Sequence, residues 1–255
     1  MSDAAIIAAF AGARRSQQHL AALPEPQPPG MDRAFRLQCA ISRELGWTQI
    51  GWKIGCTSER ARKALNAPGP FPGTMFSNRI YQSGDQVPTI ASNQRVVEPE
   101  VAFTMARALP PRGAPYAVED VMASVGAVHA AIEVVNPRTP NGFADPMPWF
   151  VVDGGLNDSI VVGEARKPLE RAAYAALGAE VIWNGRTMTG GVGANALGGG
   201  DKALAWLANH LNDKGLGLKE GDIVTTGVIT DFFSAAPGDM VEARFDGLGT
   251  VTLRF

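Results

Sequence analysis

The chain has 255 residues, of which 45% are hydrophobic and 19% are charged, and its formal net charge at pH 7 is -2. This near-neutral balance gives no reason to expect a nucleic acid or an anionic membrane as a partner. No apolar run is long enough to span a bilayer. The chain has two cysteines, Cys39 and Cys56, and its first residues lack the features of a signal peptide. We therefore expect a protein of the reducing cytoplasm.

The first 46 residues predict a helical arm. Apolar residues at helical spacing indicate a helix over residues 3 to about 22. Prolines between positions 24 and 30 interrupt that pattern, and a second helix is predicted over 31–45, with Gly46 as its stop. The apolar face of the first helix carries Ile6, Ile7, Phe10 and Ala13. We predict two parts, a helical arm at 1–46 and a main domain at 47–255.

Strands dominate the prediction beyond the arm. Strands are expected at 48–55, 94–106, 130–136, 149–155, 159–164, 179–188, 222–230 and 240–255, and helices at 57–66, 118–129 and 201–212. Asn184-Gly185 and Asp246-Gly247 suit tight hairpin turns. Because strands and helices do not alternate regularly, we expect a mixed α+β fold and not a doubly wound parallel sheet.

Three glutamates stand in otherwise apolar strand segments. Glu98 and Glu100 lie two apart in VVEPEVAF, so a strand would place both on one face, and Glu133 is alone in AAIEVV. Pro99 cannot donate to a ladder, which predicts an edge strand or a bulge at this point. The Glu98 and Glu100 pair fits a solvated strand edge as well as it fits a site. Three carboxylates together would form an all-oxygen site suited to Mg²⁺ or Mn²⁺.

A lysine and two glycine-containing segments are further candidates. Lys53 in GWKIG could hold a substrate carboxylate or transfer a proton, although a lysine at a strand edge fits the same pattern. The TTGVIT segment, Thr225 to Thr230, could form a small anion-binding cup or an ordinary strand-end turn. The glycine-rich segment 190–200 lacks a βαβ unit and a phosphate-loop lysine, so we expect a flexible loop beside a site.

The histidines and cysteines give no convincing metal site or nucleophile. His19, His129 and His210 are scattered along the chain, and we expect each at the surface or the end of a helix. Cys39 is expected as a small buried apolar side chain, and Cys56 has no evident base partner.

Seven segments, in this order along the chain, resemble one known family: GWKIGCTS, GTMFSN, VVEPEVAF, AAIEVVNPR, LGGGDKALAWLANHL, GDIVTTGVIT and PGDMVEARFDGLGTVTLRF. This is the hydratase/decarboxylase family of aromatic meta-cleavage pathways, within the fumarylacetoacetate hydrolase superfamily. The likeness to its 2-oxopent-4-enoate hydratase-like members runs from about residue 30 to the end. It implies a mixed β-sandwich roll of the fumarylacetoacetate hydrolase C-terminal type with an N-terminal helical arm, and an enzyme of aromatic hydrocarbon catabolism.

The resemblance also implies roles for single residues. It implies a Mg²⁺ or Mn²⁺ site at Glu98, Glu100 and Glu133, where the metal holds the 2-oxo and carboxylate oxygens of a substrate and stabilises enolate charge. Lys53 matches the family lysine and would hold or protonate the substrate, and Asp153 is retained in VDGGLND. The implied substrate-binding positions are Thr226, Gly227, Thr230 and Asn157.

The chain departs from the family pattern near these residues. Asn78 stands where the hydratases usually carry Asp, and an amide cannot take a proton as a carboxylate can. We still group Asn78 with Lys53 and Asp153 as the catalytic set. The other departures are Gly154 in place of Asn, Leu156 and Asn157 in place of two serines, and Gly198-Gly199-Gly200 in place of Gly-His-Pro. The metal ligands are thus kept while residues around them differ.

The expected activity is that of a metal-dependent hydro-lyase, which adds water to a 2-hydroxy-2,4-dienoate or 2-oxo-enoate. The alternatives are a 2-oxo-enedioate decarboxylase of the 4-oxalocrotonate type, an acylpyruvate C–C hydrolase, and a non-catalytic metal-binding relative or partner subunit. The expected partner is a small 2-oxo acid. A homo-oligomer is also expected, and hydratases and decarboxylases of the family associate, so another pathway enzyme is a conceivable partner.

Overall fold

The computed structural model describes residues 1–25, 29–90 and 92–255. The helices are α1 (Asp3–Ser16), α2 (Met31–Leu45), α3 (Glu59–Ala64), α4 (Val118–Met122), α5 (Pro148–Val152), α6 (Arg171–Ala176) and α7 (Gly200–Asp213). Single 3-10 turns are η1 (Ser77–Arg79), η2 (Gly142–Ala144), η3 (Gly154–Leu156) and η4 (Gly193–Asn195). The strands are β1 (Gln49–Gly55), β2 (Phe71–Phe76), β3 (Ile80–Gln82), β4 (Val96–Met105), β5 (Val125–Val135), β6 (Asn157–Val162), β7 (Gly178–Trp183), β8 (Arg186–Val192), β9 (Ile223–Val228), β10 (Phe233–Ser234), β11 (Met240–Phe245) and β12 (Gly249–Arg254).

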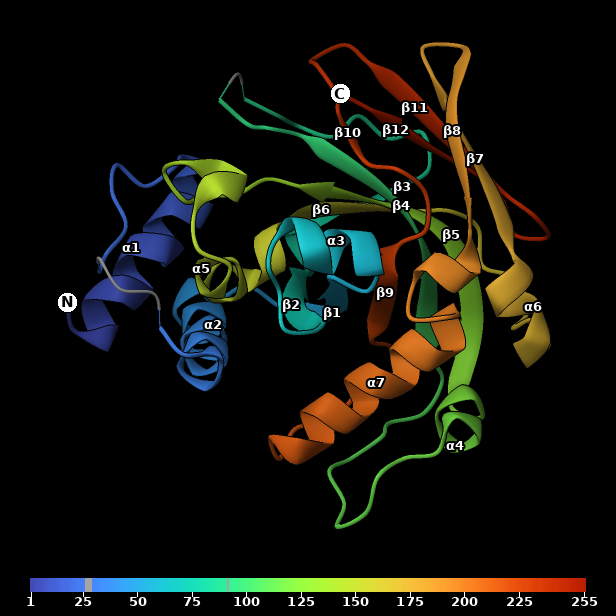
Figure 1. Cartoon of the computed structure of the whole chain (residues 1–255), viewed down its shortest axis with the longest axis horizontal. Coiled ribbons are helices and arrows are strands. Elements are labelled where there is room, and N and C mark those ends of the chain that lie inside the picture. The colour runs from blue at the N-terminus through green and yellow to red at the C-terminus, as the bar shows by residue number, and fades with distance from the viewer. Residues whose placement is uncertain (26–28, 91) are drawn as a thin grey trace.

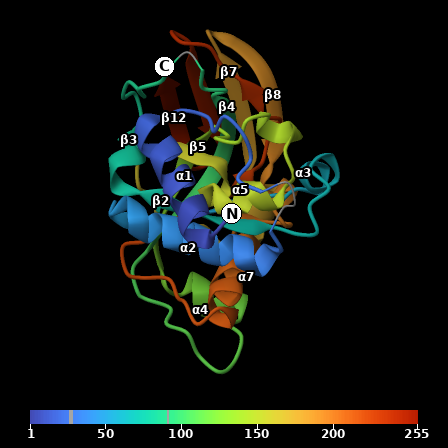
Figure 2. The same ribbon diagram turned by 90° about the vertical axis from the view of Figure 1, so that its left-hand side faces the viewer.

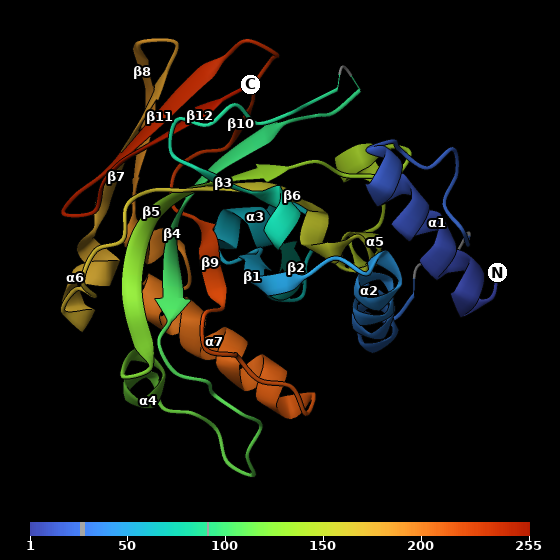
Figure 3. The ribbon, with the colours of Figure 1, turned by 180° about the vertical axis from the view of Figure 1, so that it is seen from behind.

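Two sheets make up the body of the molecule (Figure 1). The larger sheet has the order β2-β1-β9-β4-β5-β6-β3, with β10 also paired to β4, and its β1–β9 and β3–β6 pairs are parallel. The smaller sheet, β12-β11-β7-β8, is antiparallel throughout. Its strands β11 and β12 contact β5 of the larger sheet, and Figure 3 shows β4 and β5 running side by side below it. This mixed, two-sheet arrangement confirms the predicted α+β fold.

The two N-terminal helices lie at one end of the molecule, on the left in Figure 1, and they face the viewer in Figure 2. Helix α1 packs on α2, and α2 packs on α5 and β2. Ile6 and Phe10 of α1 are fully buried, and the Phe10 ring stacks on Trp149 at a centroid distance of 6.0 Å. The apolar face predicted for this helix is therefore the face that anchors the arm. The division into an arm at 1–46 and a catalytic domain at 47–255 stays a prediction.

Several local predictions are confirmed. Gly46 caps α2 in a left-handed conformation, and the Ser58 hydroxyl accepts from the Ala61 amide at the start of α3. Asn184 and Gly185 both have positive φ angles, as a type I′ hairpin between β7 and β8 requires. In the described part of the chain, no helix is both long and apolar enough to cross a membrane.

Three predicted elements were wrong in kind or extent. The helix predicted at 118–129 ends at Met122, because pairing with β4 extends β5 back to Val125. The strand predicted at 149–155 is instead the buried helix α5 followed by a 3-10 turn, since a continuous apolar run fits either structure. Helix α1 ends at Ser16, before a left-handed Gln17, and not near residue 22. The predicted proline break at 24–30 lies partly outside the described residues.

The glycine-rich segment 190–200 is a loop only in part, which corrects that prediction. It forms the end of β8, the turn η4, a connection at 196–199 and the start of α7. A Cβ on Gly191 would lie 1.9 Å from the Ile229 carbonyl oxygen, and one on Gly193 would lie 1.9 Å from that of Tyr174. These glycines therefore serve the close approach of neighbouring backbones.

The strand that carries Pro99 is not an edge strand. β4 lies between β5 and β9, and the Pro99 carbonyl accepts from the Ile229 amide at 3.1 Å. The register between β4 and β9 shifts between Glu100 and Ala102, so the bulge alternative matches this place in the sheet.

Candidate metal centre and its cavity

Three glutamates converge where β4 and β5 pair. Glu98 lies directly opposite Glu133 in the antiparallel register, and Glu100 follows two residues along the same face of β4. One carboxylate oxygen from each residue can be chosen so that all three lie within 4.8 Å of one another. Glu100 and Glu133 are fully buried and Glu98 is half-buried, which does not fit the alternative of a solvated strand edge.

Neighbouring groups orient the two buried carboxylates. The Asn157 side-chain amide donates to Glu133 Oε1 at 2.9 Å, and the Gly227 backbone amide donates to Glu100 Oε2 at 2.6 Å. Lys53 Nζ lies 3.1 Å from Glu133 Oε2. Glu100 Oε1 is buried and has no hydrogen-bond partner among the described residues. A buried carboxylate oxygen in that state is available to a ligand.

The charges at this centre are unbalanced without a cation. Burial raises the pKa of Glu98 to about 7, where the charge of Glu133 adds to the effect and Lys53 opposes it. Burial and the charge of Glu133 raise the pKa of Glu100 well above its usual range. Burial acts against the charge on Lys53, but the neighbouring carboxylates outweigh it and raise the pKa of the lysine. Three carboxylates beside one ammonium group fit a hard divalent cation, which favours oxygen ligands.

Glycines on two neighbouring segments make room for the Lys53 side chain. A Cβ on Gly73 of β2 would lie 2.8 Å from Lys53 Cγ, and one on Gly155 of η3 would lie 3.0 Å from Lys53 Cδ. Gly155 has a φ of 70°, which an L side chain rarely adopts. The Lys53 side chain is 3% exposed, so the prediction of a lysine at a strand edge does not describe it.

A cavity of about 340 Å³ opens beside the glutamates and Lys53. Lys53, Glu98 and Thr57 line it together with Gly155 and Gly227, and most of the remaining wall is apolar. The Thr57 hydroxyl is buried and has no hydrogen-bond partner among the described residues. The lining thus includes a cationic side chain and a carboxylate.

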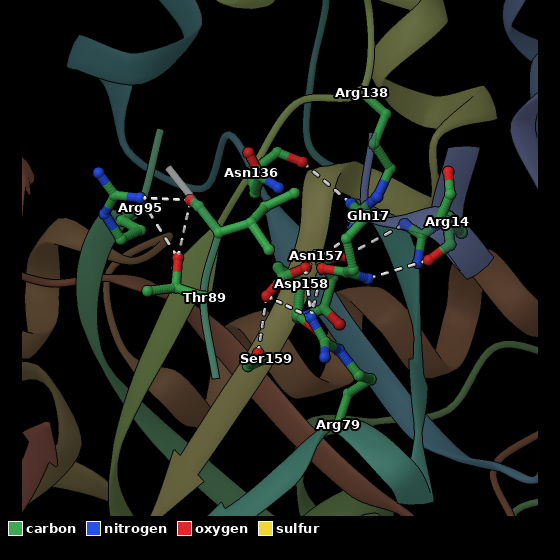
Figure 4. A network of polar contacts seen from close by, with 12 residues as sticks. Arg14, Gln17, Arg79, Thr89, Arg95, Asn136, Arg138, Asn157, Asp158 and Ser159 are labelled. Carbon is green, nitrogen blue, oxygen red and sulfur yellow. Dashed lines mark hydrogen bonds and ion pairs between the residues drawn. The ribbon is translucent and has the colours of Figure 1, made fainter. Parts of the chain in front are cut away.

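A buried network of arginines and aspartates holds the backbone of Asn157 (Figure 4). Arg14 of α1 and Arg138 donate to the Asn157 carbonyl oxygen at 3.1 and 3.3 Å. Asp153 Oδ1 lies 3.3 Å from Arg14 Nε, and Asp153 Oδ2 accepts from the Arg138 amide at 2.8 Å. The N-terminal helix is in this way connected to the residue that orients Glu133.

The second acid of this network, Asp158, bridges two arginines. It accepts from Arg138 Nη2 at 2.5 Å and from Arg79 Nη2 at 2.7 Å. Burial opposes its charge, yet these guanidinium groups hold the pKa of Asp158 below its usual range. For Asp153 burial prevails, and its pKa is raised despite Arg138 and Arg14.

Of the other predicted site residues, some line a cavity and others do not. Gly227 lines the cavity, and Thr230 lines a second cavity that adjoins it. Thr226 is not among the described residues that line either cavity, and its hydroxyl donates to the Val101 carbonyl at 2.9 Å. Asn78 is exposed in the turn η1, and Asp153 belongs to the arginine network, so neither is among the described residues that line the cavity.

Some residues of the site escaped the sequence analysis, and two smaller predictions need correction. Thr57 and the buried arginines Arg14 and Arg138 were not singled out, because a hydroxyl or a basic residue in sequence gives no sign of burial. His129 is a buried strand residue whose Nε2 lies 2.9 Å from the Thr104 hydroxyl, not a residue of a helix surface or end. Cys39 is half-buried and not fully buried.

Comparison with known proteins decides the family. A model of the fumarylacetoacetate (FAA) hydrolase C-terminal family matches residues 57–255. The chain belongs to this family. It is 30% identical over 267 residues to a 2-keto-4-pentenoate hydratase of Burkholderia vietnamiensis, an alignment that covers 100% of this chain and 99% of the relative. It is 29% identical over 225 residues to a 4-oxalocrotonate decarboxylase of Pseudomonas putida, covering 87% of this chain and 84% of the relative.

Solved structures of family members have the same fold. The 4-oxalocrotonate decarboxylase from Pseudomonas putida G7, complexed with magnesium and adipate, superposes with a TM-score of 0.86 at 24% identity and covers 100% of this chain and 98% of that chain. Fumarylpyruvate hydrolase from Pseudomonas aeruginosa, in complex with Mn²⁺ and pyruvate, gives 0.61 at 12% identity, covering 82% of this chain and 89% of that chain. The family resemblance and the mixed β-roll predicted from the sequence are confirmed.

Proposed function

We propose that this chain is a metal-dependent hydro-lyase that adds water to a 2-hydroxy-2,4-dienoate or the corresponding 2-oxo-enoate. The observation that carries this function is the group of Glu98, Glu100 and Glu133 beside Lys53, at the wall of a cavity of about 340 Å³. Relatives along the chain's whole length are 2-keto-4-pentenoate hydratases and a 2-hydroxyhexa-2,4-dienoate hydratase, which supports water addition.

The three glutamates would hold Mg²⁺ or Mn²⁺. Glu100 Oε1, which has no hydrogen-bond partner among the described residues, and the three clustered carboxylates fit such an ion. Solved relatives contain magnesium, calcium or Mn²⁺. A divalent cation bound there would supply Lewis-acid polarisation of the carbonyl of a 2-oxo acid. Glu133 is held for this role by Asn157, and Glu100 by the Gly227 amide.

Lys53 would bind the acidic head of the substrate. Its ammonium group is kept charged by the carboxylates around it and lines the cavity, so it can donate hydrogen bonds to a substrate carboxylate or to an oxygen that gains charge. Burial of the lysine strengthens this interaction, because bulk water competes less for it. The roles predicted for Asn78, Asp153, Thr226 and Thr230 have no such support from contacts with the cavity.

Turnover measurements on a substrate panel test the proposal. The purified protein with Mg²⁺ or Mn²⁺ should consume the dienol absorbance of 2-hydroxypenta-2,4-dienoate and incorporate solvent oxygen, and Glu133→Gln should abolish this. Faster release of CO₂ from 4-oxalocrotonate would favour a decarboxylase, the alternative suggested by the decarboxylase relatives. Faster cleavage of an acylpyruvate would favour a C–C hydrolase. No turnover of any member would favour a non-catalytic metal-binding relative.

The assembly and location of the protein are also proposals. We propose a homo-oligomer of the cytoplasm, with a second enzyme of the same pathway as a conceivable partner. Size-exclusion chromatography with light scattering at several protein concentrations tests the first point, and a single monomeric mass at all concentrations would contradict it.

A further inference from the structure

We infer that this cavity accepts a 2-oxo acid with one carboxylate and an uncharged hydrocarbon tail, and that it discriminates against 2-oxo dicarboxylates. The inference rests on the proposed function, because it takes the glutamate centre and Lys53 as the binding place of the 2-oxo acid head. It adds the chemistry of the substrate's tail, the end opposite the 2-oxo acid head. The substrates of the known relatives differ in this tail.

Polar side chains are confined to the head end of the cavity. Lys53 is the one cationic side chain among the described residues that line it, and its ion pair with Glu133 directs it to the glutamate centre. Thr57 lies against Gly227, since a Cβ on that glycine would be 1.8 Å from the Thr57 hydroxyl oxygen. Gly227 in turn donates to Glu100, so the free Thr57 hydroxyl belongs to the head end as well.

Most of the remaining wall is hydrocarbon contributed by several separate segments. Val96 of β4 and Val135 of β5 are paired in the sheet and buried, and Phe71 of β2 is buried beside them in the lining. Leu65, after α3, and Phe143 of η2 also belong to this wall. A hydrocarbon tail gains free energy by leaving water for such a wall, whereas a second carboxylate would lose its hydration without a partner.

The sequence of α3 separates charged from apolar residues around this cavity. Ala61, Ala64 and Leu65, at helical spacing, line the apolar cavity, whereas its basic residues line the adjoining cavity on the other side. Arg62 is also engaged, because its Nη1 donates to the carbonyls of Cys56 and Thr57 at 3.2 and 2.8 Å. Arg60 pairs with Asp231 and lies over the ring of Phe232, which lines the cavity, and neither arginine is among the described residues that line it.

Binding of three stable 2-oxo acids tests the inference without turnover. Calorimetric titration of the Mg²⁺-loaded protein would compare pyruvate, 2-oxohexanoate and 2-oxoadipate, of which the last two have chains of equal length. We expect 2-oxohexanoate to bind roughly tenfold or more tighter than pyruvate, as added methylenes in an apolar pocket typically give. We expect 2-oxoadipate to bind at least about tenfold more weakly than 2-oxohexanoate, because its distal carboxylate is desolvated without a partner.

A matched pair of variants gives a second, independent measurement. Ala64 is exposed at the wall of the cavity and can be replaced without disturbing buried packing, and Arg and Gln are both good helix formers. Ala64→Arg should tighten 2-oxoadipate relative to 2-oxohexanoate by roughly tenfold, and Ala64→Gln should not.

The outcomes separate the two proposals. If pyruvate binds in a Mg²⁺-dependent manner but 2-oxoadipate binds as tightly as 2-oxohexanoate, the inference about the tail is overturned and the proposed function stands. If none of the three acids binds with Mg²⁺ present, the proposed function is overturned and the inference falls with it. An unchanged preference in Ala64→Arg would also count against the assignment of this wall to the tail.

Discussion

Glu100→Gln should make the metal-free protein more stable and remove most of its stabilisation by metal. Glu100 is fully buried, within 4.8 Å of carboxylate oxygens of Glu98 and Glu133, and one of its own oxygens has no hydrogen-bond partner in the described structure. Glutamine has the same shape without the charge, and its carbonyl oxygen can still accept from the Gly227 amide. The substitution therefore changes the electrostatics of the centre and little else.

Without metal, Glu100 is either charged and repelled by the neighbouring carboxylates, or protonated. Each of these two states costs free energy, and the two costs set the size of the effect. Two carboxylates 4.8 Å apart repel by about 3.5 kcal/mol at an effective dielectric constant near 20. Protonating a carboxyl of ordinary pKa, about 4.3, at pH 7 costs about 4 kcal/mol. The buried side-chain amide of the new glutamine needs a hydrogen-bond partner of its own, and this cost reduces the gain in stability by about 1–3 kcal/mol. We expect a net gain of about 1–3 kcal/mol at pH 7 without metal.

The pH dependence of this gain has a definite sign. The pKa of Glu100 is raised in the folded protein, so above the unfolded pKa the folded chain binds more protons than the unfolded chain, and folding is penalised. When the pH falls below the unfolded pKa, both states are protonated and the penalty disappears. The advantage of Glu100→Gln over the wild type should therefore shrink toward pH 4.

Urea unfolding followed by tryptophan fluorescence measures these differences. Each protein would be unfolded with EDTA and again with Mn²⁺ at about 100 times the dissociation constant, where the wild type should gain about 2.7 kcal/mol. Glu220→Gln, at an exposed position outside the centre, is the matched control and should change little in either condition. If Glu100→Gln were less stable than the wild type in EDTA at pH 7, or gained as much from Mn²⁺, three carboxylates would not share one cation here.

Three further predictions concern the groups around the centre. Asn157→Ala should weaken Mn²⁺ binding by roughly 10–100-fold, because Glu133 loses the amide that orients it. Calorimetry that gives the variant and the wild type equal affinity for Mn²⁺ would contradict this. Lys53→Met should lower kcat/KM for the dienoate, and an unchanged rate would refute the role of the lysine. Without metal, the same substitution should destabilise the fold by about 3 kcal/mol, because Glu133 loses its ion-pair partner. Asp158→Asn should cost about 3 kcal/mol at neutral pH, and the difference should shrink as the pH falls below the unfolded pKa of about 4 toward the depressed folded pKa. A difference that does not shrink between pH 7 and pH 3 in urea titrations would refute it.

The three glutamates as candidates, a hairpin turn and a helix stop could be predicted from the sequence because they depend on local spacing. A pair of acids two residues apart shares one face of any strand, and turn residues such as Asn184-Gly185 fix a hairpin through their own backbone preferences. The stop of α2 at Gly46 has the same local origin. Elements that depend on distant partners were less predictable, as β5 shows by starting at Val125 inside a predicted helix.

The tertiary structure decided what the local signals left open. Whether Glu98 and Glu100 were solvated acids depended on the pairing of β4 with β5, which sets Glu133 opposite Glu98. The spacing of residues within one strand does not determine that pairing. The links from Arg14 of α1 to Asn157 and from Asn157 to Glu133 join residues 143 and 24 positions apart. Burial then raises the pKa values of Glu98 and Glu100 and leaves Glu100 Oε1 without a hydrogen-bond partner in the described structure. The sequence by itself determined which residues carry the charges, and only the packing of distant segments determined that those charges lie together out of water, because desolvation depends on every neighbour that covers a group.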